Sequence, residues 1–188
     1  MSIAAAIKRH VRAGQLFQLQ LMMDSDTPKR GFYLSPEIND LLYGPWNSDE
    51  HKIRSSRLQA ELESFARGKH ISVCMTPTKA RAIHDMAILH PPKAAVWDYR
   101  SRAPKPGPGL RLFGHFALPD HFIAFTWYPR SKPWNGKQEM GDQLHPLWNV
   151  AMNHCKTEWQ GLFPKHEPFY SENCHEYITS AADFDSDP

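Results

Sequence analysis

The hydrophobic pattern of the chain alternates between a helical period and a strand period, and each change marks an element. Apolar residues recur at three- and four-residue spacing in five segments, which predicts helices at 2–12, 36–43, 48–68, 76–90 and 143–160. Ser35 and Ser48, each followed within two residues by an acidic side chain, mark two of the helix starts. Gly68 is placed to end the third helix, and Pro91 and Pro92 stop the fourth.

Alternation of apolar and polar positions predicts strands at 15–23, 70–75, 94–101, 110–118 and 121–128. The last three strands follow one another through short connections, of which the second is the tight turn Pro119–Asp120. Short connections join antiparallel neighbours, so these strands should form a meander. We therefore expect an α+β fold, in which an antiparallel meander of about four to five strands packs against N-terminal helices and carries an added C-terminal helix.

Composition and charge limit the classes of protein that the chain can belong to. Of the 188 residues, 41% are hydrophobic, which excludes a disordered chain, and no apolar run approaches the ~18 residues of a membrane span. Three widely spaced cysteines and a start unlike a secretory signal favour the cytoplasm. We expect a single domain over residues 1–165 and an acidic tail at 166–188, frayed from Ala181 onward.

Charge is unevenly distributed along the chain, although the net charge is only +2. Eight basic and two acidic residues lie between Lys93 and Lys137, whereas residues 166–188 hold six acidic residues and no Lys or Arg. The first region could attract a polyanion, and the second would repel it or compete for the same surface.

Basic side chains gather on one face of the predicted meander. If the apolar faces of the strands pack together, alternation leaves an open surface formed by Arg100, Arg102, Arg111 and His115. Arg130 and Lys132 follow the third strand at the rim. Such a surface suits phosphates, and nearby aromatic side chains such as Trp127 and Tyr128 can stack on bases. The alternative is an ordinary solvated sheet face with an Arg–Asp98 ion pair.

Few other groups suggest chemistry. Because the unperturbed pKa of an imidazole lies near neutrality, His115 is a candidate general acid or base, with a hydrogen-bonded structural histidine as the alternative. Tyr128 is a second candidate for proton transfer. The C-terminal histidines and cysteines lack the spacing of a metal site. A phosphate loop, a dinucleotide fingerprint and a nucleophile elbow are also missing from the sequence, so we expect no metal and no cofactor.

The strand sequences resemble the RelE/ParE toxin superfamily, including its phage-derived relatives. Three strand patterns carry the resemblance: Trp97, Tyr99 and Arg100 in the first strand, Arg111, Leu112 and Phe113 in the second, and Ile123, Phe125 and Arg130 in the third. The resemblance covers about residues 15–132. It implies an N-terminal strand, two helices and an antiparallel meander, and it implies a toxin–antitoxin or mobile-element setting.

The ribonuclease branch of this superfamily cuts messenger RNA on the ribosome without a metal ion, and the resemblance implies the same activity here. Arg111 and Arg100 would then steady the scissile phosphate, and Arg130 or Lys132 would stabilise the transition-state charge. His115 or Tyr128 would transfer protons. The residues expected to contact RNA are Arg100, Arg102, Lys132 and Trp127. The acidic tail is a candidate to cover the basic face in place of a separate antitoxin.

A function of another class fits the same sequence. The chain could be a non-enzymatic protein-interaction module or regulator of phage or plasmid origin. Trp134, Trp148 and Trp159 would then be candidate anchors for a protein partner, because tryptophan is enriched at interface hot spots. The alternative use of these side chains is packing in the core.

Overall fold

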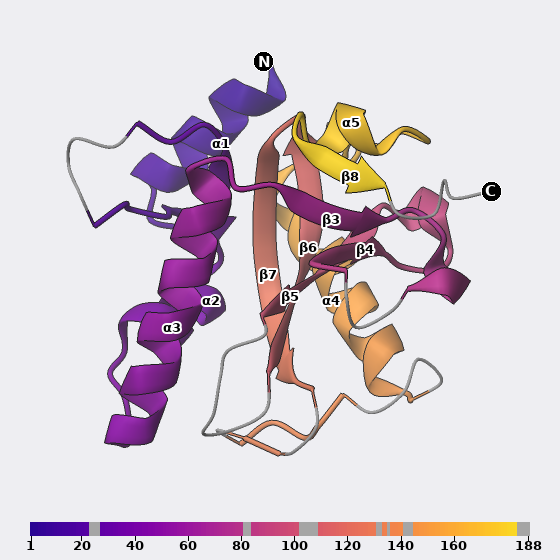
Figure 1. Cartoon of the computed structure of the whole chain (residues 1–188). Coiled ribbons are helices and arrows are strands. Elements are labelled where there is room, and N and C mark those ends of the chain that lie inside the picture. Colours follow the sequence, from indigo (N-terminus) through magenta and orange to yellow (C-terminus); the bar gives the residue numbers. More distant parts are fainter. Residues whose placement is uncertain are drawn as a thin grey trace.

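The computed structural model describes residues 1–22, 27–80, 84–101, 109–130, 133–134, 136–140 and 145–183 (Figure 1). Its strands are β1 Phe17–Gln18, β2 Gly31–Leu34, β3 Ile71–Cys74, β4 Met86–Ile88, β5 Val96–Ser101, β6 Leu110–Leu118, β7 His121–Pro129 and β8 Ala181–Asp183. Its helices are α1 Ile3–Arg12, α2 Pro36–Tyr43, α3 Asp49–Ala66, α4 Leu147–Leu162 and α5 Cys174–Tyr177, with short 3-10 turns η1 Pro77–Lys79 and η2 Pro92–Ala94. The strands described form one sheet in the order β1-β2-β7-β6-β5-β4-β3-β8.

The sheet is mixed, so the expected antiparallel meander of four to five strands is wrong as a fold class. Strands β5, β6 and β7 are adjacent and antiparallel, with Arg111 opposite both Arg100 and Tyr128. However, β2 pairs with β7 in parallel, and β3 is parallel to both β4 and β8. The β2–β7 and β3–β8 pairs join segments far apart in the sequence, which the local alternation of residues does not encode.

The helix expected at 76–90 is also wrong, because this segment supplies a central strand. Among the described residues of this segment only the turn η1 is helical, and Met86–Ile88 forms β4 between β5 and β3. The run Met86-Ala87-Ile88-Leu89 is buried throughout. A short continuous apolar run is typical of a strand covered on both faces, and its period cannot be distinguished from that of a buried helix.

Part of the expected acidic tail belongs to the folded sheet. Residues 174–177 form α5, and Ala181–Asp183 forms β8 rather than a frayed end. Tyr177 is fully buried, with its ring against Trp97 and Phe116, and its hydroxyl accepts a hydrogen bond from the backbone N–H of Ser171. Residues 184–188, which hold two of the expected acidic side chains, lie outside the described residues.

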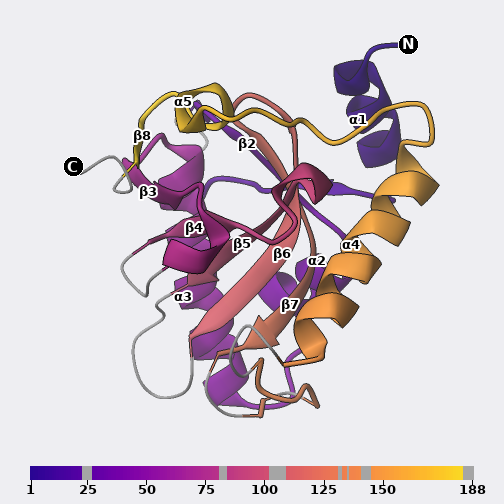
Figure 2. The ribbon, with the colours of Figure 1, turned by 90° about the vertical axis from the view of Figure 1, so that its right-hand side faces the viewer.

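Helices cover both faces of the sheet (Figure 2). One apolar cluster joins α2, α3 and α5 to one face, and includes Leu58, Phe65, Leu112 and Tyr177. The second cluster joins α1 and α4 to the other face, and includes Ile7, Phe113, Ile123 and Trp159. Arg100, Arg111 and His115, which the sequence placed on a basic face, therefore lie on the α4 side of the sheet.

Candidate functional site

Asp98 is the centre of a buried ion pair on the α4 side of the sheet. Its side chain is fully buried, and its Oδ2 accepts from Arg100 Nε at 2.9 Å and from Arg111 Nη1. Burial lowers the pKa of the Arg111 guanidinium, while the Asp98 carboxylate raises it. Arg100 is only 3% exposed, whereas the Arg111 side chain keeps 15% of its surface in solvent. Of the two arginines that contact Asp98, Arg111 is therefore the one that a ligand can reach.

The predicted open basic surface is therefore wrong, because α4 packs across it. Trp148 at the start of α4 packs edge-on against Phe113, and its ring carries the Arg111 guanidinium 4.8 Å above the ring centroid. Further along α4, Trp159 packs against His115. The basic residues share this face with apolar side chains such as Phe113, and burying those side chains against the apolar side of α4 is favourable.

His115 is a buried structural histidine and not a surface acid or base. It is fully buried, and its Nδ1 bonds to the Ala95 carbonyl oxygen at 2.8 Å. Burial is the main cause that lowers the pKa of His115 to about 4, so the imidazole is neutral at pH 7. It lies four residues from Arg111 along β6, which is about 13 Å in a strand.

The burial of His115 makes the stability of the fold depend on pH. The pKa is about 4 in the folded chain, against 6.5 for the unperturbed imidazole, so below pH 6.5 the unfolded chain binds a proton that the folded chain excludes. We expect the free energy of unfolding to fall by about 1.4 kcal/mol per pH unit from about pH 6.5 to about pH 4, in total by about 3 kcal/mol. Urea unfolding at several pH values measures this.

The matched variant for this measurement is His115→Phe, which keeps an aromatic ring beside Trp159. Whatever its stability at pH 7, its loss of stability toward pH 4 should be smaller than that of the wild type by the same 3 kcal/mol or so. Parallel pH profiles for the two chains would contradict the neutral buried imidazole.

The structure separates the other predicted site residues from one another. Trp127 lies on the opposite face of β7, is 3% exposed and packs against Trp134. Arg130 follows the end of β7, where its backbone N–H donates to the Gly109 carbonyl. Arg102 and Lys132 lie outside the described residues. Trp127 is therefore not available for base stacking.

The tryptophans considered as partner anchors are also buried. Trp134, Trp148 and Trp159 are 9%, 5% and 2% exposed. They pack within the apolar clusters of the two sheet faces. The core-packing alternative is the one that the structure supports for these three side chains.

Tyr128 is the centre of a second polar group on the α4 side of the sheet, next to Arg111. The two residues are cross-strand partners in β7 and β6. The ammonium group of Lys137 lies 4.5 Å from the centroid of the Tyr128 ring and donates to Thr126 Oγ1, to the Trp127 carbonyl and to Glu37 Oε1. Tyr128 thus has Arg111 as its neighbour on β6 and the Lys137 ammonium group over its ring, near the end of the β6–β7 pair.

Glu37 of α2 connects this polar group to His154 of α4. It lies in the first turn of α2, where Ser35 caps the helix, and it accepts a hydrogen bond from Thr126 Oγ1 at 2.9 Å. Its second oxygen lies 3.9 Å from His154 Nε2 on α4. The side chains of Glu37 and His154 are 35% and 41% exposed, so both groups are open to solvent. We call Glu37, Arg111, Tyr128, Lys137 and His154 the β7 site.

The β7 site combines cations with groups that can move protons. Burial is the main cause that raises the pKa of Tyr128, and the Glu37 carboxylate raises it further, so the phenol keeps its proton at neutral pH. Tyr128 can therefore donate a proton but is a poor base. His154 is partly exposed, and an imidazole nitrogen is the commonest proton acceptor in enzyme sites. With Asp98 and Arg100 included, three cations face two carboxylates, which leaves one net positive charge.

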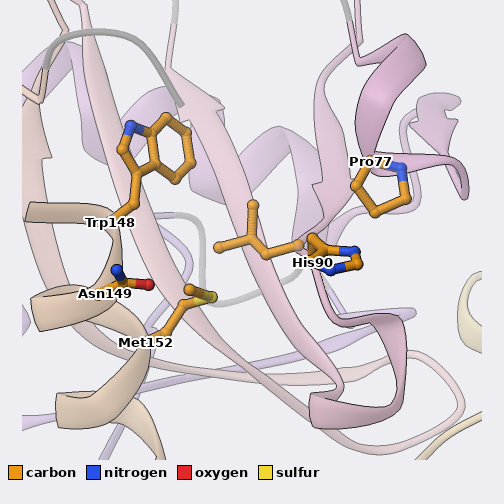
Figure 3. Close-up of a pocket in the computed structure, with 6 residues that line it drawn as sticks. Pro77, His90, Trp148, Asn149 and Met152 are labelled. Atoms are coloured by element: carbon orange, nitrogen blue, oxygen red, sulfur yellow. The ribbon is translucent and has the colours of Figure 1, made fainter. Parts of the chain in front are cut away.

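A pocket of about 160 Å³ lies between the first turns of α4 and the residues that flank β4 (Figure 3). Trp148, Asn149 and Met152 form its α4 wall, and Pro77, Leu89 and His90 line the rest. Trp148 also contacts the Arg111 guanidinium of the β7 site, so this tryptophan lies between the pocket and the site. Its lining combines apolar side chains with the Asn149 amide and the His90 imidazole, groups that can contact a flat heterocycle.

Sequence reasoning missed three of the five residues of the β7 site. Glu37 was interpreted only as a helix-start signal, Lys137 only as one of many basic residues, and His154 only as a metal-ligand candidate. No short motif links them, because they come from α2, the segment after β7 and α4. Only the tertiary fold brings these side chains together.

Comparison with protein-family models, with curated protein sequences and with solved structures finds no match to this chain. Within the described parts of the chain, no helix is long and apolar enough to cross a membrane. The class that fold and site define is thus an α+β chain, as expected, with helices on both faces of a mixed sheet and a partly exposed cationic site beside one helix.

Proposed function

We propose that this protein binds RNA at the β7 site and cleaves it without a metal ion, as its resemblance to the RelE/ParE toxins implies. The observation that carries the proposal is the placement of Arg111, Tyr128 and Lys137 beside Glu37 and His154. This set supplies phosphate-binding cations and partly exposed proton-transfer groups within one site. A cytoplasmic, mobile-element setting with the ribosome or an antitoxin as partner remains part of the proposal.

Arg111 and Lys137 are suited to hold a backbone phosphate. Each keeps part of its side chain in solvent, 15% for Arg111 and 24% for Lys137. Their partners Asp98 and Glu37 fix them in place, so little side-chain entropy is lost on binding. The pocket beside Trp148 offers a place for an adjoining base. RNA affinity should fall about sevenfold when salt is raised fourfold, if these two cations each contact a phosphate of a single strand.

The reaction uses the RNA 2′-hydroxyl as its nucleophile. His154 accepts the proton of this hydroxyl, and the 2′ oxygen forms a bond to the neighbouring phosphorus. The bond from phosphorus to the 5′ oxygen breaks, and the Tyr128 hydroxyl donates a proton to that leaving oxygen. Arg111 and Lys137 stabilise the negative charge of the transition state. The products are a 2′,3′-cyclic phosphate and a 5′-hydroxyl, and solvent restores both side chains.

The substitutions Tyr128→Phe and His154→Gln test these roles with little disturbance of the fold. Each should lower the rate of RNA cleavage about 100-fold or more, because a positioned acid or base contributes that much. The free energy of unfolding should change by less than about 0.5 kcal/mol for His154→Gln, since the side chain is 41% exposed. The measurement is cleavage of a labelled RNA in the presence of EDTA.

His175→Gln is the matched control for this assay. His175 is an exposed histidine of α5, and its backbone N–H is held by the side chain of Asn173. Its substitution should leave the cleavage rate unchanged. Equal loss of activity in all three variants, or none in any of them, would overturn the roles assigned to Tyr128 and His154.

The protein-interaction alternative has its own observation. Tyr43 at the end of α2 and Trp46 just after it are 40% and 36% exposed, which is unusual for large aromatic side chains. A protein-binding module should lose its partner on Tyr43→Ala and keep it on Tyr128→Phe. The cleavage proposal expects the opposite pattern for RNA.

A further inference from the structure

Arg54 in α3 has a buried guanidinium group with no hydrogen-bond partner among the described residues. The residue is 1% exposed, and all three side-chain nitrogens are buried and unpartnered. Glu50, one helical turn earlier, acts on Arg54 through its charge but forms no ion pair with it in the described part of the chain. Burial lowers the pKa of the Arg54 guanidinium. A buried cation without hydrogen bonds is rare in folded proteins and is costly.

The ring contact that the described residues make with the Arg54 guanidinium involves its flat face and not its N–H groups. The guanidinium carbon lies 4.0 Å from the centroid of a Trp134 ring, and His51 packs edge-on against the same tryptophan at 4.8 Å. A cation–π contact of this kind occupies the flat face of the guanidinium. The five N–H donors point outward in the plane of the group, so the stack satisfies none of them. The N–H edge is left to an acceptor from outside the described fold.

Two cations are linked here by a pair of tryptophan rings. Trp134 packs against Trp127 with ring centroids 5.3 Å apart, and the Lys137 ammonium group lies 5.0 Å from the Trp127 centroid. The first turns of α3 lie at the same end of the molecule as the end of β7 (Figure 1). Arg54 therefore lies near the β7 site, with Trp127 and Trp134 between the two cations.

We propose that the N–H edge of Arg54 is a phosphate-binding subsite, with Trp134 as the platform that holds the guanidinium flat. A tetrahedral phosphate offers several acceptor oxygens to the fork of donors. Phosphate is favoured over a single carboxylate because its tetrahedral oxygens can accept from more of the unpartnered nitrogens of Arg54 at once. The subsite goes beyond the proposed cleavage reaction and does not depend on it, since a bare phosphate ion should bind.

The test is thermal unfolding of the full chain in inorganic phosphate, compared with chloride at the same ionic strength. Because the N–H edge is covered in the ligand-free chain, samples are equilibrated for hours before each melt. Saturating phosphate should raise the Tm of the wild type by roughly 5 °C, since a ligand that binds only the folded state stabilises it. Arg54→Met should remove the response to phosphate and raise the Tm in chloride by about the same amount.

Lys52→Met is the matched control, because Lys52 is an exposed cation of the same helix. It should keep the full phosphate response. A wild type that responds equally to phosphate and chloride overturns the proposal, and so does an Arg54→Met chain that keeps the phosphate response. If Arg54→Met does not fold, Arg54→Lys is tested in its place. This variant keeps the positive charge but replaces the planar guanidinium, with its several N–H donors, by a single ammonium group. Its phosphate affinity should fall at least tenfold, and an unchanged affinity overturns the proposal.

Three further ligands identify the source of the phosphate and separate this proposal from the cleavage reaction. A 5′-mononucleotide and a short RNA test a nucleic-acid source, and an acidic peptide tests a protein source. A response to phosphate or RNA that is lost in Arg54→Met supports the subsite even when no RNA is cleaved. A response to the acidic peptide alone overturns it, because the acceptor would then be a carboxylate of a protein partner.

Discussion

Replacing Gly114 by alanine is expected to lower the free energy of unfolding by more than about 3 kcal/mol. A Cβ atom at this position would lie 1.9 Å from the carbonyl oxygen of Ile123 and 3.0 Å from the Cα of Ala124. Both are backbone atoms of β7, which is fixed by pairing on its two sides. The register between β6 and β7 shifts at Gly114, and the close approach of the two strands there requires a residue without a side chain.

Gly161→Ala is the control for this substitution and should have the opposite sign. Gly161 lies inside α4, and a Cβ there would meet nothing within 4 Å. Alanine in a helix is favoured over glycine, so the free energy of unfolding should rise by about 0.5–1 kcal/mol. Urea unfolding of the two variants and the wild type gives both numbers. Similar changes for Gly114→Ala and Gly161→Ala would contradict the strand geometry described.

Asp98→Asn is expected to lower the free energy of unfolding by about 3–5 kcal/mol, because it removes the buried carboxylate to which two guanidinium groups donate. Arg100 and Arg111 are cross-strand partners, and both donate to the same oxygen of Asp98. The neutral amide keeps the shape of the side chain but not its charge. The Tm should fall by roughly 10 °C in a domain of this size.

Asp40→Asn provides the comparison, since Asp40 is an exposed acid of α2. Its substitution should change the free energy of unfolding by less than about 0.5 kcal/mol. Calorimetric or urea unfolding of the two variants is the measurement. If Asp98→Asn costs less than about 1 kcal/mol, the arginines have other acceptors and Asp98 is not the centre of the pair.

The Asp98 ion pair also determines which variants can test function. Arg111→Ala removes a phosphate-binding candidate, but it also leaves the buried Asp98 with one partner fewer. A loss of activity in that variant would combine a loss of stability with a loss of chemistry. Tyr128→Phe and His154→Gln avoid this, because neither side chain shares the Asp98 ion pair.

The sequence predicted those elements that local periodicity determines. Capping serines and apolar spacing located α2 and α3, and alternation located β5, β6 and β7 with their antiparallel pairing. It did not predict β4, whose apolar run Met86–Ile88 fits a buried helix equally well, or β8, whose pairing with β3 spans more than a hundred residues. Parallel pairing leaves no short turn in the sequence from which it could be recognised.

The site was predicted only in part. Arg111 and Tyr128 were both predicted as site residues, and the structure places them side by side as cross-strand partners. The apolar side of α4 was recognisable, but nothing in the sequence showed which surface it covers. Its docking over Phe113 and His115 converted the expected open face into a core. The same docking brought His154 to Glu37, a pairing that no sequence spacing encodes.

The measurement that tests the central claim most directly compares one RNA with its 2′-deoxy counterpart, both incubated with the wild-type chain in EDTA. The RNA should be cut to products with a 2′,3′-cyclic phosphate and a 5′-hydroxyl. The deoxy strand should be bound and stay intact, because it lacks the nucleophile. An RNA that is neither bound nor cut, or equal cleavage of both strands, would contradict a β7 site that acts through the 2′-hydroxyl.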